Sequence, residues 1–354
     1  MPRAETENPA TVPPPRANPD LIGHAGAEAR LANAFARGRL AHAWLIAGPR
    51  GIGKATLAYR FARHVLASSS AYAHRPERSL FDKPGTVPEG QGLYLDPAHP
   101  VFRRVAAGGH ADLFTVEPAF DEKKGARRTE IVIEDVRGVG EFLSLTPAEG
   151  GWRVVVVDCA DDMNRNAANA VLKVLEEPPA RALLLLVSHN PGALLPTIRS
   201  RCQRLALAPL DPGDAARVIG GLMPSLSEAE AVELARLAEG SPGRALELAS
   251  EDGLALQQEL GGLLDALPDL DGVALQRFGD KVGKSGAEAA FRIATDILRR
   301  RLNGLAIGDP GRWLEVRDRV DERLARVDSL NLDRKSAMMD AVFQARAAAV
   351  RTRY

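Results

Sequence analysis

Short apolar runs alternate with longer amphipathic segments in the N-terminal part of the chain. The runs lie at residues 43–47, 112–116, 153–158 and 183–187. The third contains four consecutive valines, which is typical of a parallel strand buried on both faces. Segments with helical spacing lie at residues 56–67, 131–145 and 164–177, and the second of them opens as a short strand. Strands that alternate with helices predict an α/β domain with a parallel sheet.

The remainder of the chain carries helical patterns. From about Leu210 onward no segment has convincing strand periodicity. Ser227 and Glu230 form the Ser-x-x-Glu pattern of a helix N-terminus, and residues 240–243 break the helix that follows. Two longer amphipathic helices are predicted, at residues 287–305 and 312–327. The fold class is therefore α/β plus all-α.

Composition adds a tail and excludes several classes of protein. Residues 1–20 contain six prolines and no apolar core of a signal peptide, so they predict a disordered tail. Residues 70–100 are rich in proline, glycine and polar residues and predict a loop or insertion of open role. No apolar run reaches the ~18 residues of a membrane span. Cys159 and Cys202 are too few for a disulfide framework, which fits a reducing cytoplasm.

Charge is distributed unevenly although the net charge is zero. Residues 1–204 hold 26 basic and 22 acidic groups, residues 205–280 hold 4 and 14, and residues 281–354 hold 16 and 10. An acidic middle between basic ends indicates separate modules rather than one continuous nucleic-acid-binding face. The basic stretch Arg299–Arg301 leaves two alternatives open, a contact with phosphates or a solvated helix face.

Residues 48–55 match the phosphate-binding pattern G-x-x-x-x-G-K-[ST] at every fixed position except the last. Gly48, Gly53 and Lys54 occupy the required positions, with a further glycine, Gly51, inside the loop. Ala55 stands where a hydroxyl would hold Mg²⁺. Thr56 follows, but one helical step turns its side chain by roughly 100°, so it does not substitute. The loop follows a strand and precedes a helix, and this context favours phosphate binding over an incidental glycine-rich turn.

The strand at 153–158 ends in a second candidate group, Asp158. An aspartate at this place binds the Mg²⁺ shell in P-loop ATPases. The next position, where many such ATPases carry a catalytic glutamate, holds Cys159, and Asp161 is displaced along the chain from that position. The alternative is an aspartate that only ends a strand and a cysteine that only fills the core. Together with Ala55, these residues predict weak or absent hydrolysis, and no intact metal site.

Three segments carry a resemblance to a known family. The sequences Leu-Lys-Val-Leu-Glu-Glu-Pro-Pro at 172–179, the strand at 184–187 and Leu-Pro-Thr-Ile-Arg-Ser-Arg-Cys at 195–202 resemble the bacterial clamp-loader ATPase family. The resemblance spans roughly residues 21–348. It implies a P-loop AAA+ parallel-sheet domain, a small helical lid and a C-terminal helical collar that packs in a ring of subunits. The expected divisions are residues 1–20 (tail), 21–208 (AAA+), 209–252 (lid) and 253–354 (collar).

The resemblance also implies roles for individual residues. Arg201, in Ser-Arg-Cys, is implied to act in trans as an arginine finger on the ATP of a neighbouring gamma/tau-type subunit. Without the family, an arginine that bridges a helix end would be preferred. Arg244 matches the lid arginine called sensor 2, with a solvated first-turn arginine as the alternative. Ser188 lies near the sensor-1 position, and Cys202 is expected to be a small buried residue.

The implied function is that of a stator-like ring member in the DNA polymerase III holoenzyme, which is not itself the polymerase. Its expected partners are gamma/tau and delta clamp-loader subunits, and, through the complex, the sliding clamp and primer-template DNA. The family commonly carries a four-cysteine zinc module, but residues 67–110 contain no cysteine, so no zinc is expected in this chain. Binding of ATP or ADP without turnover stays open, as does the order of the neighbouring subunits.

Two other functions compete with this one. An active gamma/tau-like ATPase motor would need a hydroxyl at Ala55 and a carboxylate at Cys159. A small-molecule P-loop kinase would leave the C-terminal helical residues unexplained. Turnover by the purified chain separates the first alternative from the non-hydrolysing subunit.

Overall fold

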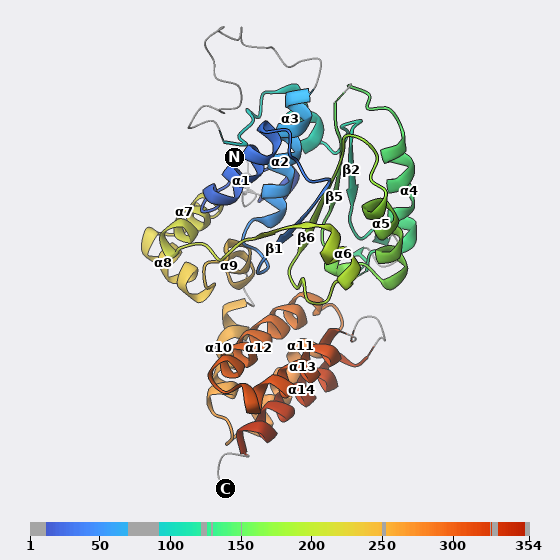
Figure 1. The fold of residues 1–354 in the computed structure, drawn as a ribbon. Helices are drawn as coiled ribbons and strands as arrows, with labels where there is room; N and C mark the ends of the chain where they lie inside the picture. The colour runs from blue at the N-terminus through green and yellow to red at the C-terminus, as the bar shows by residue number, and fades with distance from the viewer. Residues whose placement is uncertain are drawn as a thin grey trace, which may run out of the picture. The chain divides into compact units, whose positions relative to one another are not determined.

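The computed structural model describes residues 12–69, 92–121, 126–128, 130–149, 151–249, 253–325, 327 and 332–350. The chain forms two compact units, residues 1–244 and residues 245–354. The first is built around a β-sheet and the second is helical over its described residues (Figure 1). Each unit has a hydrophobic core of its own.

The sheet of the first unit has five strands, and all its pairings are parallel. The strands are β1 (Ala43–Ala47), β2 (Leu113–Val116), β5 (Arg153–Val157), β6 (Ala182–Ser188) and β7 (Gln203–Ala206). Their order across the sheet is β2-β5-β6-β1-β7. Every residue of β1, β5 and β6 is buried, as expected for apolar runs covered on both faces. The predicted α/β class with a parallel sheet is confirmed.

Three strands were not predicted from the sequence. Strand β7 lies at the edge of the sheet, and only one of its residues, Leu205, is buried, so it shows no run of apolar residues. The other two, β3 (Phe120–Asp121) and β4 (Ala126–Arg127), form a short antiparallel pair. Such short elements carry too few residues for a periodic signal.

Helices cover both faces of the sheet (Figure 1). On one face lie α1 (Ala25–Ala36), α2 (Lys54–Ser69) and α3 (Pro100–Ala106), and on the other lie α4 (Ile133–Ser144) and α5 (Arg165–Glu176). Two short elements, η2 (Ala160–Asp162) and α6 (Pro196–Arg201), follow strands β5 and β6. The helices α2, α4 and α5 were predicted, whereas α1 and α3 were not. Apolar side chains of α4 and α5 pack with those of β5 and β6 in one buried cluster.

Helix α5 begins as the sequence predicts, with Asn164 as its N-cap. The side-chain oxygen of Asn164 accepts a hydrogen bond from Ala167 N at 3.0 Å. We expect Asn164→Ala to lower the free energy of unfolding by about 1 kcal/mol, because a backbone donor at the helix start loses its partner. Asn169→Ala, at an exposed position within the same helix, is the matched control. Urea denaturation of both variants measures the difference, and equal stabilities would contradict the capping role.

The first unit ends in a group of short helices, α7 (Pro212–Leu222), α8 (Glu228–Leu237) and the start of α9 (Pro242–Leu248). Ser227 and Glu230 form the predicted capping box of α8. Gly240 ends this helical segment with φ of +73°, and a Cβ there would lie 2.1 Å from Leu210 O. Because only glycine tolerates this approach, the predicted break between α8 and α9 has a steric cause.

The described residues of the second unit form helices α10 (Gly253–Asp265), α11 (Gly272–Gly283), α12 (Glu288–Gly308), α13 (Pro310–Ala325) and α14 (Arg334–Val350). Leucine, valine and alanine side chains from all of them make one buried cluster. The predicted helices at 287–305 and 312–327 correspond to α12 and α13. Among the helices that the structure describes, none has the length and apolar character that crossing a membrane requires.

The predicted disorder of residues 1–20 is wrong for residues 12–20, while residues 1–11 lie outside the described part. Residues 15–17 form a short 3₁₀ helix, η1 (Pro15–Ala17). Arg63 on α2 donates to Arg16 O at 2.9 Å and to Asn18 O at 2.8 Å, so a buried guanidinium holds the segment. Of the predicted loop at 70–100, residues 70–91 lie outside the described residues, and α3 begins at Pro100.

Candidate functional site

The phosphate-binding loop lies between β1 and α2, in the strand–loop–helix order that the sequence predicts. Its three glycines have positive φ, +156° at Gly48, +77° at Gly51 and +97° at Gly53. A Cβ at Gly48 would lie 2.4 Å from Leu207 O, so no side chain fits between this loop and the segment after β7. The motif therefore meets its backbone requirements at all three glycines.

The start of α9 holds the tip of this loop. Ser241 Oγ donates to Arg50 O at 2.8 Å, and Gly243 N donates to Gly51 O at 2.9 Å. A Cβ at Gly51 would lie 2.6 Å from Ser241 Oγ and 3.0 Å from the backbone nitrogen of Arg244. The glycine loop and the Gly-Ser-Pro-Gly-Arg segment are thus brought together from distant parts of the sequence.

Lys54 opens α2 and is buried, with 3% of the residue exposed. Its ammonium group donates to Pro49 O, within the loop itself. Burial lowers the pKa of Lys54 to about 8, and the nearby acidic groups at Asp158 and Asp161 oppose this shift. The lysine is therefore mostly charged at neutral pH. Ala55, the next residue, offers no side-chain oxygen.

Thr56 is buried at 9% exposure and lies one step beyond the position at which a metal-binding hydroxyl is expected. That it does not substitute for Ala55 stays a prediction. The loop can supply backbone donors and a lysine to an anion, whereas the hydroxyl for Mg²⁺ is missing.

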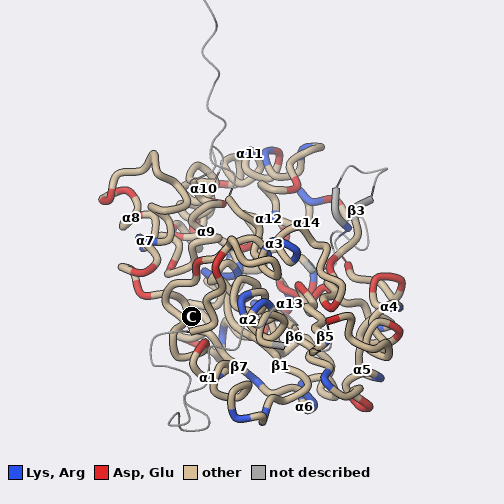
Figure 2. The backbone as a smooth tube through the Cα atoms, turned by 90° about the horizontal axis from the view of Figure 1, so that it is seen from above, with Lys and Arg blue, Asp and Glu red and all other residues tan. Residues whose placement is uncertain are grey.

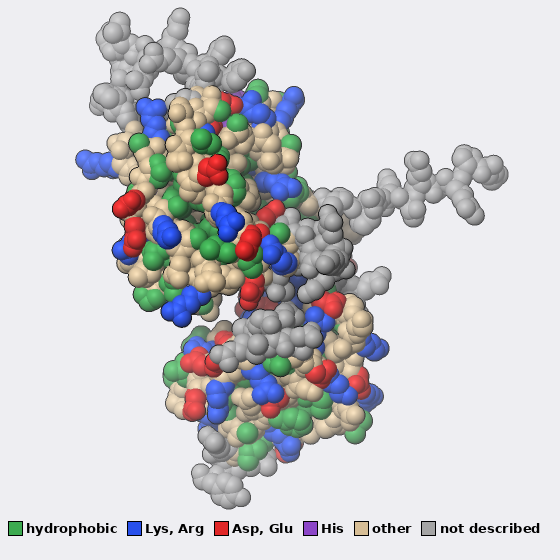
Figure 3. Space-filling model, turned by 90° about the vertical axis from the view of Figure 1, so that its right-hand side faces the viewer, with side chains coloured by type: hydrophobic (Ala, Val, Ile, Leu, Met, Phe, Trp, Pro, Cys, Tyr) green, Lys and Arg blue, Asp and Glu red, His purple; other side chains and the backbone are tan. Residues whose placement is uncertain are grey.

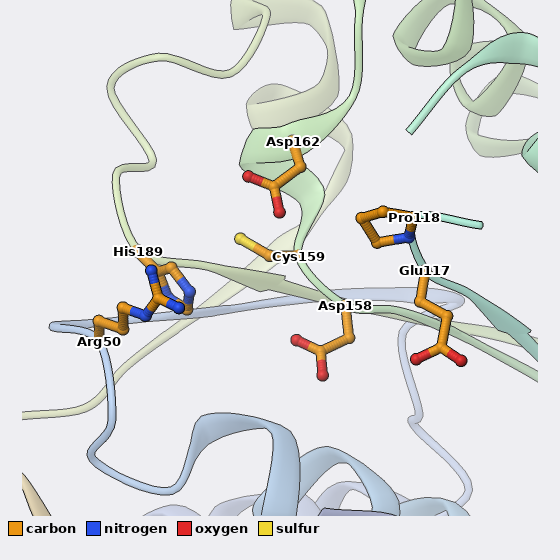
Figure 4. Close-up of a pocket in the computed structure, with 7 residues that line it drawn as sticks. All are labelled: Arg50, Glu117, Pro118, Asp158, Cys159, Asp162 and His189. Atoms are coloured by element: carbon orange, nitrogen blue, oxygen red, sulfur yellow. The ribbon is translucent and has the colours of Figure 1, made fainter. Parts of the chain in front are cut away.

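Asp158 lies directly after β5, at the carboxyl edge of the sheet, and its backbone nitrogen donates to Val116 O at 2.9 Å. It lines a cavity of about 240 Å³ next to the glycine loop. Figure 4 shows this cavity and the seven residues that line it, which are Arg50, Glu117, Pro118, Asp158, Cys159, Asp162 and His189. The structure therefore places Asp158 and the loop residue Arg50 at one pocket.

Asp161, which sequence analysis set aside, accepts several hydrogen bonds at this edge. Its carboxylate accepts hydrogen bonds from Ser188 Oγ at 2.7 Å and from the thiol of Cys159 at 2.9 Å. It also accepts from the backbone nitrogens of His189 and, at 3.3 Å, Asn190. Asp161 thus ties η2 to the end of β6, and Ser188 has a defined partner.

Burial shifts the titration of several groups at this edge. Burial and the neighbouring Asp161 raise the pKa of Asp162 to about 6. The same two causes raise the pKa of the Cys159 thiol well above its usual range. Burial lowers the pKa of His189 to about 4, with Lys54 acting in the same direction. At neutral pH, Cys159 is therefore a thiol and His189 a neutral imidazole.

Arg201 is at the end of α6, in a helix that also carries Arg199. Figure 2 draws basic positions in blue beside the α6 label. Its guanidinium lies 3.0 Å from a carboxylate oxygen of Glu176 and donates to Thr197 O at 3.2 Å. About 37% of the side chain is exposed. The contacts described for Arg201 are on α5 and α6, and none joins it to the glycine loop of its own chain. Its bridge to Glu176 is the helix-end contact expected of an arginine without a family role.

Arg244 is buried at 6% exposure, and its guanidinium lies 3.4 Å from Glu239. The alternative of a solvated Arg244 is therefore wrong. Cys202 is partly buried against the core of the first unit, and burial raises its pKa to about 12, which agrees with a packing role.

Sequence analysis assigned no role in this site to His189, Ser241 or His24. His24 Nε2 donates to Ile52 O at 2.7 Å and so supports the glycine loop from outside. The hydrogen bond from Ser241 to Arg50 O joins residues 191 positions apart in the sequence. In the Gly-Ser-Pro-Gly-Arg segment the sequence analysis considered only the arginine. The serine of this segment, Ser241, was the residue that could have indicated a contact with the glycine loop.

The parallel sheet, the glycine loop between β1 and α2, and the aspartate after β5 define a P-loop α/β domain. A model of the family described as "DNA polymerase III, delta subunit" matches residues 96–211. DNA polymerase III subunit delta′ of Pseudomonas aeruginosa is 39% identical over 208 residues, which cover 58% of this chain and 55% of that protein.

Two further relatives come from Escherichia coli. Its delta′ subunit is 32% identical over 231 residues, covering 65% of this chain and 61% of the relative. Its tau subunit is 29% identical over 292 residues, covering 78% of this chain and 41% of the relative. The chain thus spans between about two fifths and three fifths of the length of these relatives. Over the matched residues the chain is similar to DNA polymerase III delta′ subunits, and the resemblance seen in the sequence is confirmed.

Proposed function

We propose that this chain is a clamp-loader subunit of a DNA polymerase III holoenzyme that does not hydrolyse ATP itself. The observation that carries the proposal is the combination of an incomplete site and an exposed Arg201. Ala55 and Cys159 occupy the positions of the metal-binding hydroxyl and the catalytic carboxylate. Arg201 lies at the end of α6, and part of its side chain is exposed to solvent.

The residues of the loop are better suited to binding the phosphates of a nucleotide than to binding the Mg²⁺ ion that accompanies them. The glycine loop, the N-terminus of α2 and Lys54 would hold the phosphates of ATP or ADP. Arg244, whose backbone lies beside Gly51, would be the lid residue nearest to them. Mg²⁺ would lack the hydroxyl ligand at Ala55 and keep only Asp158 from the two expected protein groups. Binding without turnover follows from this set of residues.

Arg201 would serve a neighbouring subunit of the gamma/tau type. A guanidinium placed beside the transferring phosphoryl group stabilises the charge that develops there, in trans as well as in cis. The exposed ion pair with Glu176 is weak enough to be exchanged for a phosphate when the ring assembles. The chain would thereby activate hydrolysis that it cannot perform itself.

The remaining parts of the proposal follow the family. Residues 209–252 would act as the lid and residues 253–354 as the collar through which the ring is held together. The partners would be gamma/tau and delta subunits, and the complex would load the sliding clamp on primer-template DNA in the cytoplasm.

Direct DNA binding through Arg299–Arg301 has less support. Arg299 and Arg300 each lie 2.9 Å from an aspartate, and Arg301 is paired with Asp265. On the face of the helical unit drawn in Figure 3, basic and acidic side chains are interspersed. Paired arginines among acidic neighbours are typical of a solvated helix face.

The purified chain is expected to bind ATP or ADP with the same dissociation constant in Mg²⁺ and in EDTA, and to show no turnover above background. The reason is the missing hydroxyl at Ala55, since Mg²⁺ then keeps Asp158 as the one expected protein group and adds little to the binding of the phosphates. Titration of a fluorescent nucleotide and a phosphate-release assay measure the two quantities.

The matched variant is Ala55→Thr, which restores the hydroxyl and should make nucleotide affinity depend on Mg²⁺. Steady turnover by the unmodified chain, comparable to that of a working AAA+ subunit, would instead support the gamma/tau-like motor. Failure to bind nucleotide under either condition would limit the glycine loop to a structural role.

A further inference from the structure

Three potential metal ligands of different chemistry converge at the carboxyl edge of the sheet. Cys159 comes shortly after β5, Asp161 lies in η2, and His189 directly follows β6. Strands β5 and β6 are parallel neighbours, so their ends bring these residues together. One ligand atom from each, the sulfur, a carboxylate oxygen and a ring nitrogen, lie within 4.8 Å of one another.

The chemistry of this set selects a particular kind of ion. Thiolate, imidazole and carboxylate are the three side-chain ligands that zinc takes in proteins, whereas Mg²⁺ prefers oxygen alone. We propose that Cys159, Asp161 and His189 form a binding site for one Zn²⁺ ion or a similar thiophilic divalent cation. Cys159, which stands where a catalytic glutamate is expected, would thereby supply a soft sulfur ligand. The sequence-based expectation was that the chain binds no zinc and that its Mg²⁺ binding is impaired.

The surroundings of the three residues favour a cation. Nδ1 of His189 is buried and has no hydrogen-bond partner. Cys159 and His189 both line the cavity of about 240 Å³, which has room for a water as the fourth ligand (Figure 4). The sulfur of Cys159 points toward the side of the cavity on which His189 lies.

Nearby charges add to this preference. The carboxylates of Glu117, Asp158 and Asp162 line the same cavity, while Arg50 is the basic residue among the described lining groups. Lys54 is close enough to Asp158 and Asp161 for their charges to affect its titration. Arg16 lies 3.9 Å from Glu117. Together with Asp161, four acidic groups therefore lie beside three basic ones, Arg50, Lys54 and Arg16, and a divalent cation would reduce this excess of negative charge.

Binding would exchange a proton for the metal. In the metal-free chain the thiol of Cys159 donates to Asp161 at 2.9 Å. Zn²⁺ would replace that proton between sulfur and oxygen, and the proton would leave to solvent. The neutral ring of His189 would bind through a lone pair without losing a proton. The positive ion would also reverse the effect of the neighbouring acids on the thiol, since it stabilises the thiolate.

Cobalt(II) reports such a site directly, because a Co²⁺–thiolate bond gives a charge-transfer absorption band. We expect the full-length chain, treated with chelator and titrated with Co²⁺ without nucleotide, to develop this band with one ion per chain. Zn²⁺ in equal amount should remove the band, and an excess of Mg²⁺ should leave it unchanged. This readout is independent of ATP hydrolysis and of any partner subunit, so it stands or falls separately from the proposed function.

Three variants assign the ligands. Cys159→Ser, which keeps a hydrogen-bond donor toward Asp161, should abolish the band, whereas Cys202→Ser should retain it. His189→Ala should weaken Co²⁺ affinity by more than ~10-fold, the smallest loss usual even for an outer-shell partner. Circular dichroism confirms that each variant is folded. No band in the unmodified chain, a band that survives in Cys159→Ser, or displacement by Mg²⁺ would each overturn the proposal.

Discussion

Replacing Arg201 with alanine is expected to remove hydrolysis at one ATP site of a reconstituted clamp-loader complex while leaving this chain folded. An arginine finger supplied in trans is worth ~10³-fold or more in the rate of phosphoryl transfer. Removing the arginine from one subunit should therefore abolish ATP hydrolysis at the neighbouring site into which it would reach. The other ATP sites of the ring keep their own residues, so the complex should lose the hydrolysis of one site rather than all activity.

Single-turnover measurement separates these contributions. The complex is loaded with ATP, mixed with primed DNA and sliding clamp, and the released phosphate is followed with time. We expect the fast phase to lose the amplitude of one site in the Arg201→Ala complex. Steady-state rates alone would mix this loss with the turnover of the remaining sites.

Arg199→Ala is the matched control, because Arg199 is exposed on the same helix, α6. Both variants should fold normally, since the pair between Arg201 and Glu176 is partly exposed and such pairs contribute at most about 1 kcal/mol. Equal phosphate release from the two variant complexes would remove the finger assignment. A loss in both would indicate that α6 acts as an interface rather than through one guanidinium.

The parts of the fold that could be predicted from the sequence are those with long one-sided or continuous apolar patterns. Strands β5 and β6 are buried along their whole lengths, and a run of valines or leucines signals this without tertiary information. Strand β7 buries a single residue, Leu205, so its sequence resembles a loop. Helix α3 spans residues 100–106, too few for the helical period to stand out.

The candidate site divides in the same way. Gly48 to Lys54 and Asp158 are adjacent to strong strand signals, so position along the chain was enough to find them. The contacts of Asp161 with Ser188 and His189 join residues 27 and 28 positions apart, through the pairing of β5 with β6. Such a cluster follows from strand order, which local periodicity does not contain.

The buried guanidinium of Arg63 shows the same limit for stability. The sequence places Arg63 on a helix with apolar spacing, where an arginine would normally reach solvent. In the structure it is 1% exposed and lies 4.5 Å from the ring centroid of Phe102. Its two backbone acceptors, in residues 16 and 18, belong to a segment for which the sequence predicts disorder. Nothing in the sequence around Arg63 or around residues 16–18 indicates that the two segments are in contact.

We expect Arg63→Ala to lower the free energy of unfolding of the first unit by about 3–5 kcal/mol. Each hydrogen bond from a charged donor contributes about 1.5–3 kcal/mol, and two are lost together with the packing on Phe102. Burial lowers the pKa of Arg63 to about 10, so the donor is charged at neutral pH. Urea unfolding in a Trp313→Phe background measures the effect, because the remaining tryptophans, Trp44 and Trp152, belong to residues 1–244.

Two comparisons make this prediction specific to the contact with residues 12–20. Arg39→Ala, at an exposed position, should change stability by less than about 0.5 kcal/mol. Removal of residues 1–18 takes away both backbone acceptors, so Arg63→Ala should cost much less in the shortened chain than in the full one. An equal cost in both chains would mean that Arg63 stabilises α2 through Phe102 alone. In that case the N-terminal segment would be held by other contacts, such as the hydrogen bond that Arg60 donates to Pro19 O.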